Sequence, residues 1–409
     1  MVKIYDIAII GSGPAGMAAA IEASKHAGKV AVLDEQPAPG GQIYRNVQHA
    51  TDRQNQILGK DYRAGKSLAD DFIKCDATRY EGVSVWQVSD NGAIAFSRNG
   101  TAEQIKARRI IVANGATERP VPVPGWTLPG VTTAGAAQIL MKAGGLVAQS
   151  AVLVGSGPLL YLVAAQMADA GAPPKALVET QTKSDLIAAF RHWKGMVTGW
   201  RYLAKGMGLM RKLRRAGVKR YQGASAIRID GEDQADAVCF TFGGRSHRIE
   251  TETVLLHLGV VPNTQITRSL RLDHVYSSQQ SCFVPSTDPF GRSSSEVILV
   301  AGDGAVIGGA VAAELSGQLA ALGALHDLHL ISGETLESRA HPLLRTRERE
   351  LAIRPFLDRA FAPPADILRP DNDIIICRCE EVTAGDIRRF AKLGCTGPNQ
   401  AKAFGRSGM

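Results

Sequence analysis

Short apolar runs that end in glycine recur along the chain and predict buried strands followed by helices. The run "IAII" at Ile7–Ile10 leads into Gly11, and the run "VLV" at Val152–Val154 leads into Gly155. A continuous apolar run rich in β-branched residues is typical of a strand that is buried on both faces of a parallel sheet. Alanine- and leucine-rich segments follow both turns and predict helices. The pattern therefore predicts an α/β protein with two strand–turn–helix units.

The size and composition of the chain support this prediction. At 409 residues, and with roughly 150 residues per domain, two or three domains are expected. The composition, with 45% hydrophobic and 21% charged residues, excludes a disordered or fibrous protein. No charged residue lies between Ala143 and Ala168, but Gly155 and Gly157 interrupt this stretch, so we expect no transmembrane segment. The start "MVKIYDIAIIGSG" does not resemble a secretory signal, which predicts a cytoplasmic protein.

The first turn, "GSGPAG", has glycine at each position that a dinucleotide-binding turn requires. Gly11 permits the tight turn, Gly13 lets the backbone approach a pyrophosphate, and Gly16 lets the helix pack close to the strand. Pro14 and Ala15 complete the turn and begin the helix, whose N-terminus favours an anionic group. We therefore expect a bound dinucleotide here.

A second strand, "VAVLDE", follows this helix and ends in two acidic residues. A carboxylate at this place accepts hydrogen bonds from the ribose of the dinucleotide. Asp34 has the usual offset from the last glycine, and Glu35 is its neighbour. The sequence leaves the choice between the two open.

The second turn, "GSGPLL", departs from the pattern at its third position. Leu160 replaces the glycine there, so the helix is expected to stand further from the strand and its N-terminus further from a phosphate. Gly155 and Gly157 still allow a backbone approach, and Glu179, at the end of "KALVE", is placed to hold a ribose. ATP or NAD in this second site stays an open alternative, but a fast and specific NADH site is not expected.

Further segments resemble the flavoprotein family with paired dinucleotide-binding domains, which includes the disulfide and ferredoxin reductases. "IIVANGATERP" is similar to the crossover strand of that family, and "VILVAGDGAVIGG" is similar to its closing segment. The loop "DEQPAPGGQIYR" is expected to pass the flavin. The resemblance implies an FAD site that includes Ala113, Asn114, Gly115, Gly302, Asp303, Gly41 and Gln42.

This resemblance also implies the domain organisation, a pair of Rossmann-like domains of the disulfide-reductase type with the second inserted in the first. The FAD-binding domain comprises residues 1–118 and 255–330, and an NAD-binding-like domain comprises residues 119–254. A helical linker at 331–370 leads to a small cysteine-containing α/β segment at 371–409. Disulfide reductases relay electrons through a cysteine pair beside the flavin, and the sequence has no such pair there.

The six cysteines are too few for a disulfide framework, and three of them lie near the C-terminal end. Cys377 and Cys379 follow an apolar strand, "III", and precede a helix expected to start near Thr383. Two thiolates do not complete the four-cysteine ligand set of a two-iron cluster. Cys395 follows a predicted helix end, where a structural cysteine is as good an interpretation as a ligand.

The same segment resembles the small [2Fe-2S] domain of the bacterioferritin-associated ferredoxin type. In that family a Cys-x-Cys pair is followed by two further cysteines in a Gly-Pro-Cys segment. The resemblance implies that Cys377 and Cys379 are cluster ligands. It also implies that two further cysteine ligands lie beyond Met409 in a longer chain.

Over its full length the chain resembles the large flavin subunits of opine oxidases, of hydrogen cyanide synthase and of dye-linked proline and hydroxyproline dehydrogenases. "DEQPAPGGQIYR", "GVTTAGAAQILMK" and "CRCEEVTAGDI" carry this resemblance. It implies an FAD-dependent oxidoreductase acting on CH–NH donors, in a hetero-oligomer with a smaller flavoprotein subunit that carries the substrate site and with a further small subunit. FMN at the partner interface and octopine or nopaline as substrate are further implications. No catalytic residue is identified in this chain.

A basic stretch at residues 191–220 holds ten Lys and Arg residues and no Asp or Glu, interleaved with aromatic residues. Such a stretch can bind nucleic acid, an anionic membrane or an acidic partner. A solvated helical pair with its apolar side on the core is favoured, and a docking surface for the partner subunit is the alternative. No nucleic-acid-binding motif accompanies it, so nucleic acid is not expected as a partner.

Two rival functions stay open at this point. A stand-alone NADH-dependent reductase of a small redox protein is disfavoured by Leu160 and by the missing cysteine pair. A catalytically idle scaffold is disfavoured by the intact first turn.

Overall fold

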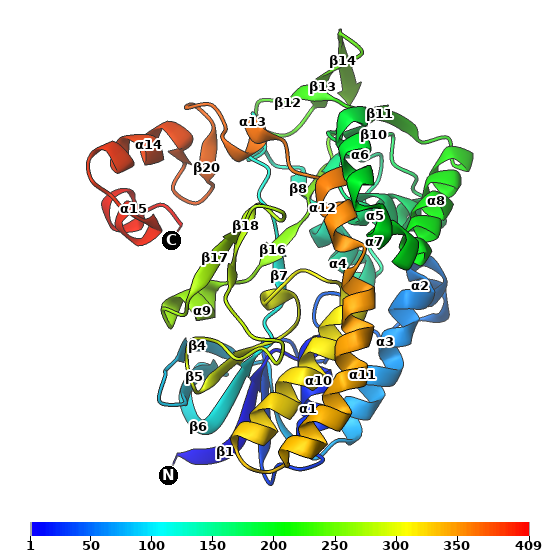
Figure 1. The fold of residues 1–409 in the computed structure, drawn as a ribbon. Coiled ribbons are helices and arrows are strands. Elements are labelled where there is room, and N and C mark those ends of the chain that lie inside the picture. Colours follow the sequence, from blue (N-terminus) through cyan, green and yellow to red (C-terminus); the bar gives the residue numbers. More distant parts are fainter. Residues whose placement is uncertain (1, 409) are drawn as a thin grey trace.

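The two glycine-terminated runs are strands of two separate sheets. In the computed structural model, which describes residues 2–408, the first run lies in β1 (Lys3–Ile10) and the second in β9 (Val152–Ser156). Helices α1 (Pro14–Ala23) and α5 (Pro158–Asp169) follow these strands after short turns. The predicted α/β fold with two strand–turn–helix units is confirmed (Figure 1).

The first sheet has the strand order β3-β2-β1-β6-β5-β4, with β19 paired to β6. Strands β1, β2, β3 and β19 run parallel to β6, and the β4–β5 hairpin is antiparallel. Their bounds are β2 Val30–Asp34, β3 Ala77–Glu81, β4 Ser84–Val88, β5 Ala93–Arg98, β6 Thr101–Val112 and β19 Ile298–Val300. Alternate residues of β1 are buried in two different apolar clusters, so both faces of this sheet are covered.

Helices α1, α3 (Lys60–Lys74) and α10 (Ala310–Asp327) belong to the apolar cluster on one face of the first sheet. A Cβ atom at Gly317 would lie 2.0 Å from the carbonyl oxygen of Ala15, so α10 crosses α1 at a distance that only glycine permits. Helix α11 (Gly333–Leu351) packs on α10. Part of the predicted linker at 331–370 is therefore built into the first unit (Figure 1).

The second sheet is entirely parallel, with the order β11-β10-β9-β15-β8. Its other strands are β8 Val131–Thr133, β10 Ala176–Glu179, β11 Lys219–Gln222 and β15 Val254–Leu258, and its main helices are α4 Ala134–Gly144, α5 and α8 Trp200–Arg215. An antiparallel meander is inserted before β15, with strands β12 Ser225–Asp230, β13 Ala237–Phe242 and β14 Arg245–Glu250.

A two-stranded ribbon joins the two units. Strand β7 (Ala116–Glu118) carries the chain out of the first unit, and β16 (Val260–Pro262) brings it back, paired antiparallel to β7. The predicted return to the FAD-binding domain at residue 255 is wrong, because β15 pairs with β9 and β8 in the second sheet. The apolar sequence of β15 fits the interior of either sheet, so the sequence alone does not place it.

The remaining elements connect and cover these units. They are α2 Asp52–Leu58, α6 Lys183–Ala189, α7 Trp193–Thr198, α9 Gln265–Ser269, β17 His274–Ser277, β18 Cys282–Pro285, α12 Arg354–Ala360 and α13 Ala365–Leu368. The C-terminal segment contains β20 Ile375–Cys377, β21 Val382–Thr383, α14 Ala384–Lys392 and α15 Pro398–Gly405. Thr383 is the N-cap of α14, as the sequence predicts. Within residues 2–408, no helix is long and apolar enough to cross a membrane.

Candidate flavin site

Two glycines of the first turn are required by the fold itself. Gly11 has φ +101°, and a Cβ atom there would lie 2.5 Å from the carbonyl oxygen of Ala113. A Cβ atom at Gly16 would lie 1.8 Å from the carbonyl oxygen of Gly11. These glycines hold the strand, the turn and α1 together, as the sequence predicts.

Gly13 differs, because the protein leaves room for a side chain at this position. Its backbone is extended, and the nearest atom to an added Cβ is the Cα of Gly41 at 3.8 Å. Gly13 is also the N-cap of α1, where no side chain caps the free backbone N–H groups. A glycine that the fold does not need, beside uncapped N–H donors, fits the close approach of a pyrophosphate.

The loop after β2 lies directly against this turn. The backbone N–H of Gly40 donates to the carbonyl oxygen of Ser12 at 2.9 Å, and a Cβ atom at Gly41 would lie 2.8 Å from the Cα of Gly13. Gln42, next in the loop, is exposed. The predicted loop and the predicted turn therefore meet at one place.

Asp34, rather than Glu35, faces the glycine turn. One carboxylate oxygen of Asp34 accepts hydrogen bonds from both the backbone N–H and the hydroxyl of Ser12, the latter at 2.8 Å. The other oxygen accepts from the backbone N–H of Gln36 at 2.7 Å. Glu35 is exposed and its side chain contacts Gln36. These contacts fix Asp34 at the carboxyl end of β2, while a ribose-binding role for either residue stays a prediction.

The crossover and closing segments complete the site at the carboxyl ends of β6 and β19. Asn114 donates from Nδ2 to the carbonyl oxygen of Asn263 at 3.0 Å, while its buried Oδ1 has no partner within residues 2–408. Asp303 accepts from the backbone N–H groups of Gly308 and Gly309 at 2.8 and 3.1 Å, and burial raises the pKa of its carboxyl. A buried acceptor without a partner is expected where a ligand supplies the missing donor. The predicted residues Ala113, Gly115 and Gly302 lie in the same two segments.

A buried lysine of the second unit binds the loop at Asp34–Arg45, which is called the flavin loop. Lys142 of α4 donates from Nζ to the carbonyl oxygen of Gln42 at 3.0 Å and to Oε1 of Gln138 at 2.9 Å. Burial and the nearby Arg45 cation lower the pKa of Lys142 to about 7, and the ring of Tyr62 lies 5.9 Å from the ammonium. The sequence showed Lys142 only as a residue of "GVTTAGAAQILMK", because nothing in that stretch reveals that a polar helix position is buried.

We expect Lys142→Met to alter the pH dependence of stability. A lysine has a pKa near 10.4 in an unfolded chain, so between pH 7 and 10 the unfolded state binds more protons than the folded state. The wild-type free energy of unfolding therefore gains up to about 1.4 kcal/mol per pH unit in this range, and this gain is absent in the variant. Urea titrations at pH 6, 7, 8 and 9 measure the difference. The exposed Lys183→Met variant is the control, and a wild-type-to-variant difference that stays constant from pH 7 to 9 would contradict the prediction.

The acidic residue that accompanies the second glycine turn is paired within the protein. Glu179 has no exposed surface, and its carboxylate accepts two hydrogen bonds from the guanidinium of Arg220, both at 2.9 Å. The ring of Phe361, which follows α12, lies 6.2 Å from that of Tyr161 in an edge-to-face contact. The expected ribose-binding role of Glu179 is therefore not available in this structure. The sequence does not reveal this pairing, because Arg220 belongs to a basic stretch whose pattern is typical of a solvated helix face.

The glycines of this turn pack against strand β15. A Cβ atom at Gly155 would lie 1.8 Å from the carbonyl oxygen of His257, as one at Gly11 would meet Ala113 in the first turn, and one at Gly157 would lie 3.4 Å from the ring of His257. His257 is buried and pairs through Nδ1 with Glu118 at 2.6 Å, as expected of a satisfied core histidine. Leu160 is fully buried in the apolar cluster beneath α5.

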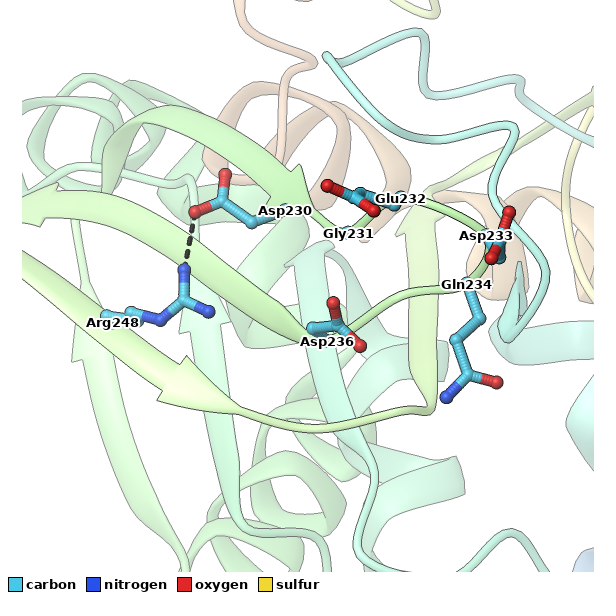
Figure 2. Close-up of a pocket in the computed structure, with 7 residues that line it drawn as sticks. All are labelled: Asp230, Gly231, Glu232, Asp233, Gln234, Asp236 and Arg248. Carbon is cyan, nitrogen blue, oxygen red and sulfur yellow. Dashed lines mark hydrogen bonds and ion pairs between the residues drawn. The ribbon is translucent and has the colours of Figure 1, made fainter.

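An open concavity of 650 Å³ lies away from these turns, in the loop between β12 and β13 (Figure 2). Its walls are largely acidic, and the carboxylate of Asp230 is paired with Arg248 at the edge of the concavity (Figure 2). An acidic wall repels the phosphates of a dinucleotide. We therefore do not assign the cofactor to it.

The predicted cluster ligands lie together in the C-terminal segment. The Sγ atoms of Cys377 and Cys379 are 3.3 Å apart. The backbone N–H of Gly408 donates to Sγ of Cys377 at 3.2 Å and lowers the pKa of that thiol. Cys395 packs in the same small apolar cluster as Cys377. No group of three or more potential metal ligands is found among the described residues, so the ligand role of Cys377 and Cys379 stays a prediction.

Comparison with known proteins assigns the family. Residues 5–320 match the pyridine nucleotide-disulphide oxidoreductase family. The chain is 42% identical to the A subunit of opine oxidase from Agrobacterium tumefaciens (strain Ach5) over 415 residues, which cover 99% of this chain and 82% of that protein. This chain belongs to the family of opine oxidase A subunits. The family is one of FAD-dependent oxidoreductases, which confirms the FAD implied by the family resemblance, while its place at the first turn stays a prediction.

More distant relatives share the fold along most of the length. Hydrogen cyanide synthase subunit HcnB of Pseudomonas protegens is 29% identical over 94% of this chain and 84% of its own. The L-proline dehydrogenase structure from P. horikoshii superposes with a TM-score of 0.66 at 18% identity, over 99% of this chain and 70% of that chain. T. acidophilum thioredoxin reductase superposes with a TM-score of 0.57 at 19% identity, over 80% of this chain and 99% of that one. These structures confirm the paired-domain fold of this opine oxidase relative.

Proposed function

We propose that this chain is the electron-relaying flavin subunit of a heteromeric dehydrogenase that oxidises the C–N bond of an opine. Removal of two electrons and two protons from the CH–NH unit gives an imine, which water splits into a 2-oxo acid and an amino acid. The substrate site lies on a smaller flavoprotein partner, and the assembly includes a further small subunit. Bound FAD supplies the two-electron to one-electron exchange that a relay requires.

The observation that carries this proposal is the contrast between the two glycine turns. The first turn keeps Gly13 open to a ligand, whereas Glu179 of the second is bound to Arg220 and has no exposed surface. A subunit with one open dinucleotide turn is suited to hold FAD but not to take hydride from NADH. The proposal therefore leaves the second turn without NAD or ATP.

The proposal extends to two further redox groups. A [2Fe-2S] cluster is held by Cys377 and Cys379 with two cysteines beyond Met409, and it receives electrons one at a time. FMN lies at the interface with the partner subunit. The close pair of sulfur atoms and the similarity to the opine oxidase family support these assignments.

An anaerobic titration of the purified flavin-loaded subunit tests this function. With NADH alone, the visible flavin absorbance should persist. With octopine or nopaline, bleaching should require the partner subunit. Glycine and proline are tested in place of the opine, because similar proteins are named for cyanide synthesis and proline oxidation. Rapid bleaching by NADH without the partner would replace the proposal with a stand-alone reductase.

A further inference from the structure

An apolar patch lies exposed on helices α6 to α8, where the sequence favoured a buried apolar side. Five large side chains recur at spacings of three or four residues and are more than half exposed. They are Ile187 (72%), Phe190 (57%), Trp193 (58%), Val197 (66%) and Trp200 (61%), and they are called the α6–α8 patch. The opposite side of α8 is anchored by Leu209 and by the fully buried Leu213. Of the five side chains, Phe190 also contacts the ring of Phe356 of α12, at 6.1 Å between the ring centres.

Cations without carboxylate partners lie on the same helices as the α6–α8 patch and extend to the end of α8. In the structure of residues 2–408, six basic side chains between 191 and 215 form no ion pair with an acidic residue. They are Arg191, Lys194, Arg201, Arg211, Arg214 and Arg215. Lys205 and Lys212, by contrast, pair with Asp61 and Asp169. The unpaired cations give this face a positive field that attracts an anionic surface.

A small concavity within the α6–α8 patch has the chemistry of a phosphate site. It measures 350 Å³, and Arg191, His192, Trp193 and Lys194 form most of its wall. No carboxylate lines it. A phosphate placed there would meet cations on one side and an indole ring on the other.

The arrangement favours a lipid surface over a folded protein. Trp193 and Trp200 are each followed directly by an exposed cation, Lys194 and Arg201. Indole rings and basic side chains occupy the same depth in the headgroup layer of a bilayer, where tryptophan is enriched.

We propose that the α6–α8 patch docks this subunit on the surface of an anionic phospholipid bilayer. Apolar side chains enter the headgroup boundary, and the unpaired cations contact lipid phosphates near the anionic surface. The cysteine-containing segment lies on the other side of the molecule from α8 and stays accessible to a partner (Figure 1). This inference does not depend on the identity of the substrate.

Vesicle sedimentation with the flavin-loaded subunit tests the proposal. The protein should bind vesicles of phosphatidylcholine with phosphatidylglycerol, not vesicles of phosphatidylcholine alone, and added salt should weaken binding. The Trp193→Ser/Trp200→Ser variant should bind at least tenfold more weakly. Trp86→Ser is the matched control, because Trp86 is 58% exposed on β4 in the first unit.

Three results would overturn the proposal. The first is the absence of binding to anionic vesicles, and the second is equal binding to neutral and anionic vesicles. The third is a double variant that binds like the wild type. If vesicles are not bound and the double variant loses the partner subunit during co-purification, the α6–α8 patch is a protein interface. Retained flavin absorbance and an unchanged melting temperature show that each variant is folded.

Discussion

The Gly13→Ala variant should fold like the wild-type protein and purify without the yellow colour of bound flavin. The backbone of Gly13 is extended, with φ −71° and ψ −175°, and the nearest atom to an added methyl group lies 3.8 Å away. The fold therefore accepts alanine. A methyl group at this position would, however, obstruct the bound dinucleotide, because the pyrophosphate must approach the backbone there. We expect the affinity for FAD to fall at least tenfold, or about 1.4 kcal/mol.

Flavin fluorescence on titration of the apoprotein measures this affinity, and circular dichroism with thermal melting measures the fold. Gly206→Ala is the matched control, since the same methyl group meets no atom within 4 Å in α8. Gly16→Ala should instead fail to fold, because its Cβ would lie 1.8 Å from the carbonyl oxygen of Gly11. If Gly13→Ala binds FAD as tightly as the wild type, the cofactor does not sit at this turn.

The Arg220→Met variant should lose about 3–5 kcal/mol of folding free energy, because the carboxylate of Glu179 would remain buried without its partner. The side chain of Glu179 is fully buried, and that of Arg220 is 30% exposed. Burial already raises the pKa of Glu179, against the opposing effect of Arg220. The double variant Glu179→Leu/Arg220→Met should recover most of the loss, since no unpaired charge remains.

Urea unfolding of the three proteins measures this difference. The exposed Arg214→Met variant, from the end of the same basic stretch, should change stability by less than about 0.5 kcal/mol. A loss below about 1 kcal/mol in Arg220→Met would mean that water reaches Glu179. The second turn would then be open in solution, and the NADH-dependent alternative would regain support.

The sequence predicts the parts of the fold and site that depend on local geometry. The clash at Gly16 involves the carbonyl oxygen of Gly11 within one strand–turn–helix unit, so the spacing of the glycines reveals it. The clash at Gly11 involves the distant Ala113, which the spacing does not reveal. The capping box at Thr383 is local in the same way. Asp303 and Asn114 came from a family resemblance, because nothing near them in the chain shows that they meet the first turn.

Features that depend on distant partners were missed. Arg220 and Glu179 are 41 residues apart, and the charge run around Arg220 is typical of a solvated helix face. Lys142 contacts the loop at Gln42, 100 residues away. The exposed α6–α8 patch was missed because an amphipathic pattern shows that a helix has an apolar side, not what covers that side.

The bonds that join α4 and α5 of the second unit to α2 and the segment before it also bear on motion within the molecule. Beside Lys142, Asn46 and Gln54 donate to the carbonyl oxygens of Lys142 and Met141, at 3.2 and 3.3 Å, and Gln166 donates to that of Leu58 at 3.1 Å. Rotation of one unit about the β7–β16 ribbon would break all these bonds together. These bonds therefore oppose rotation about the ribbon, and we expect the two units to keep one relative orientation during turnover.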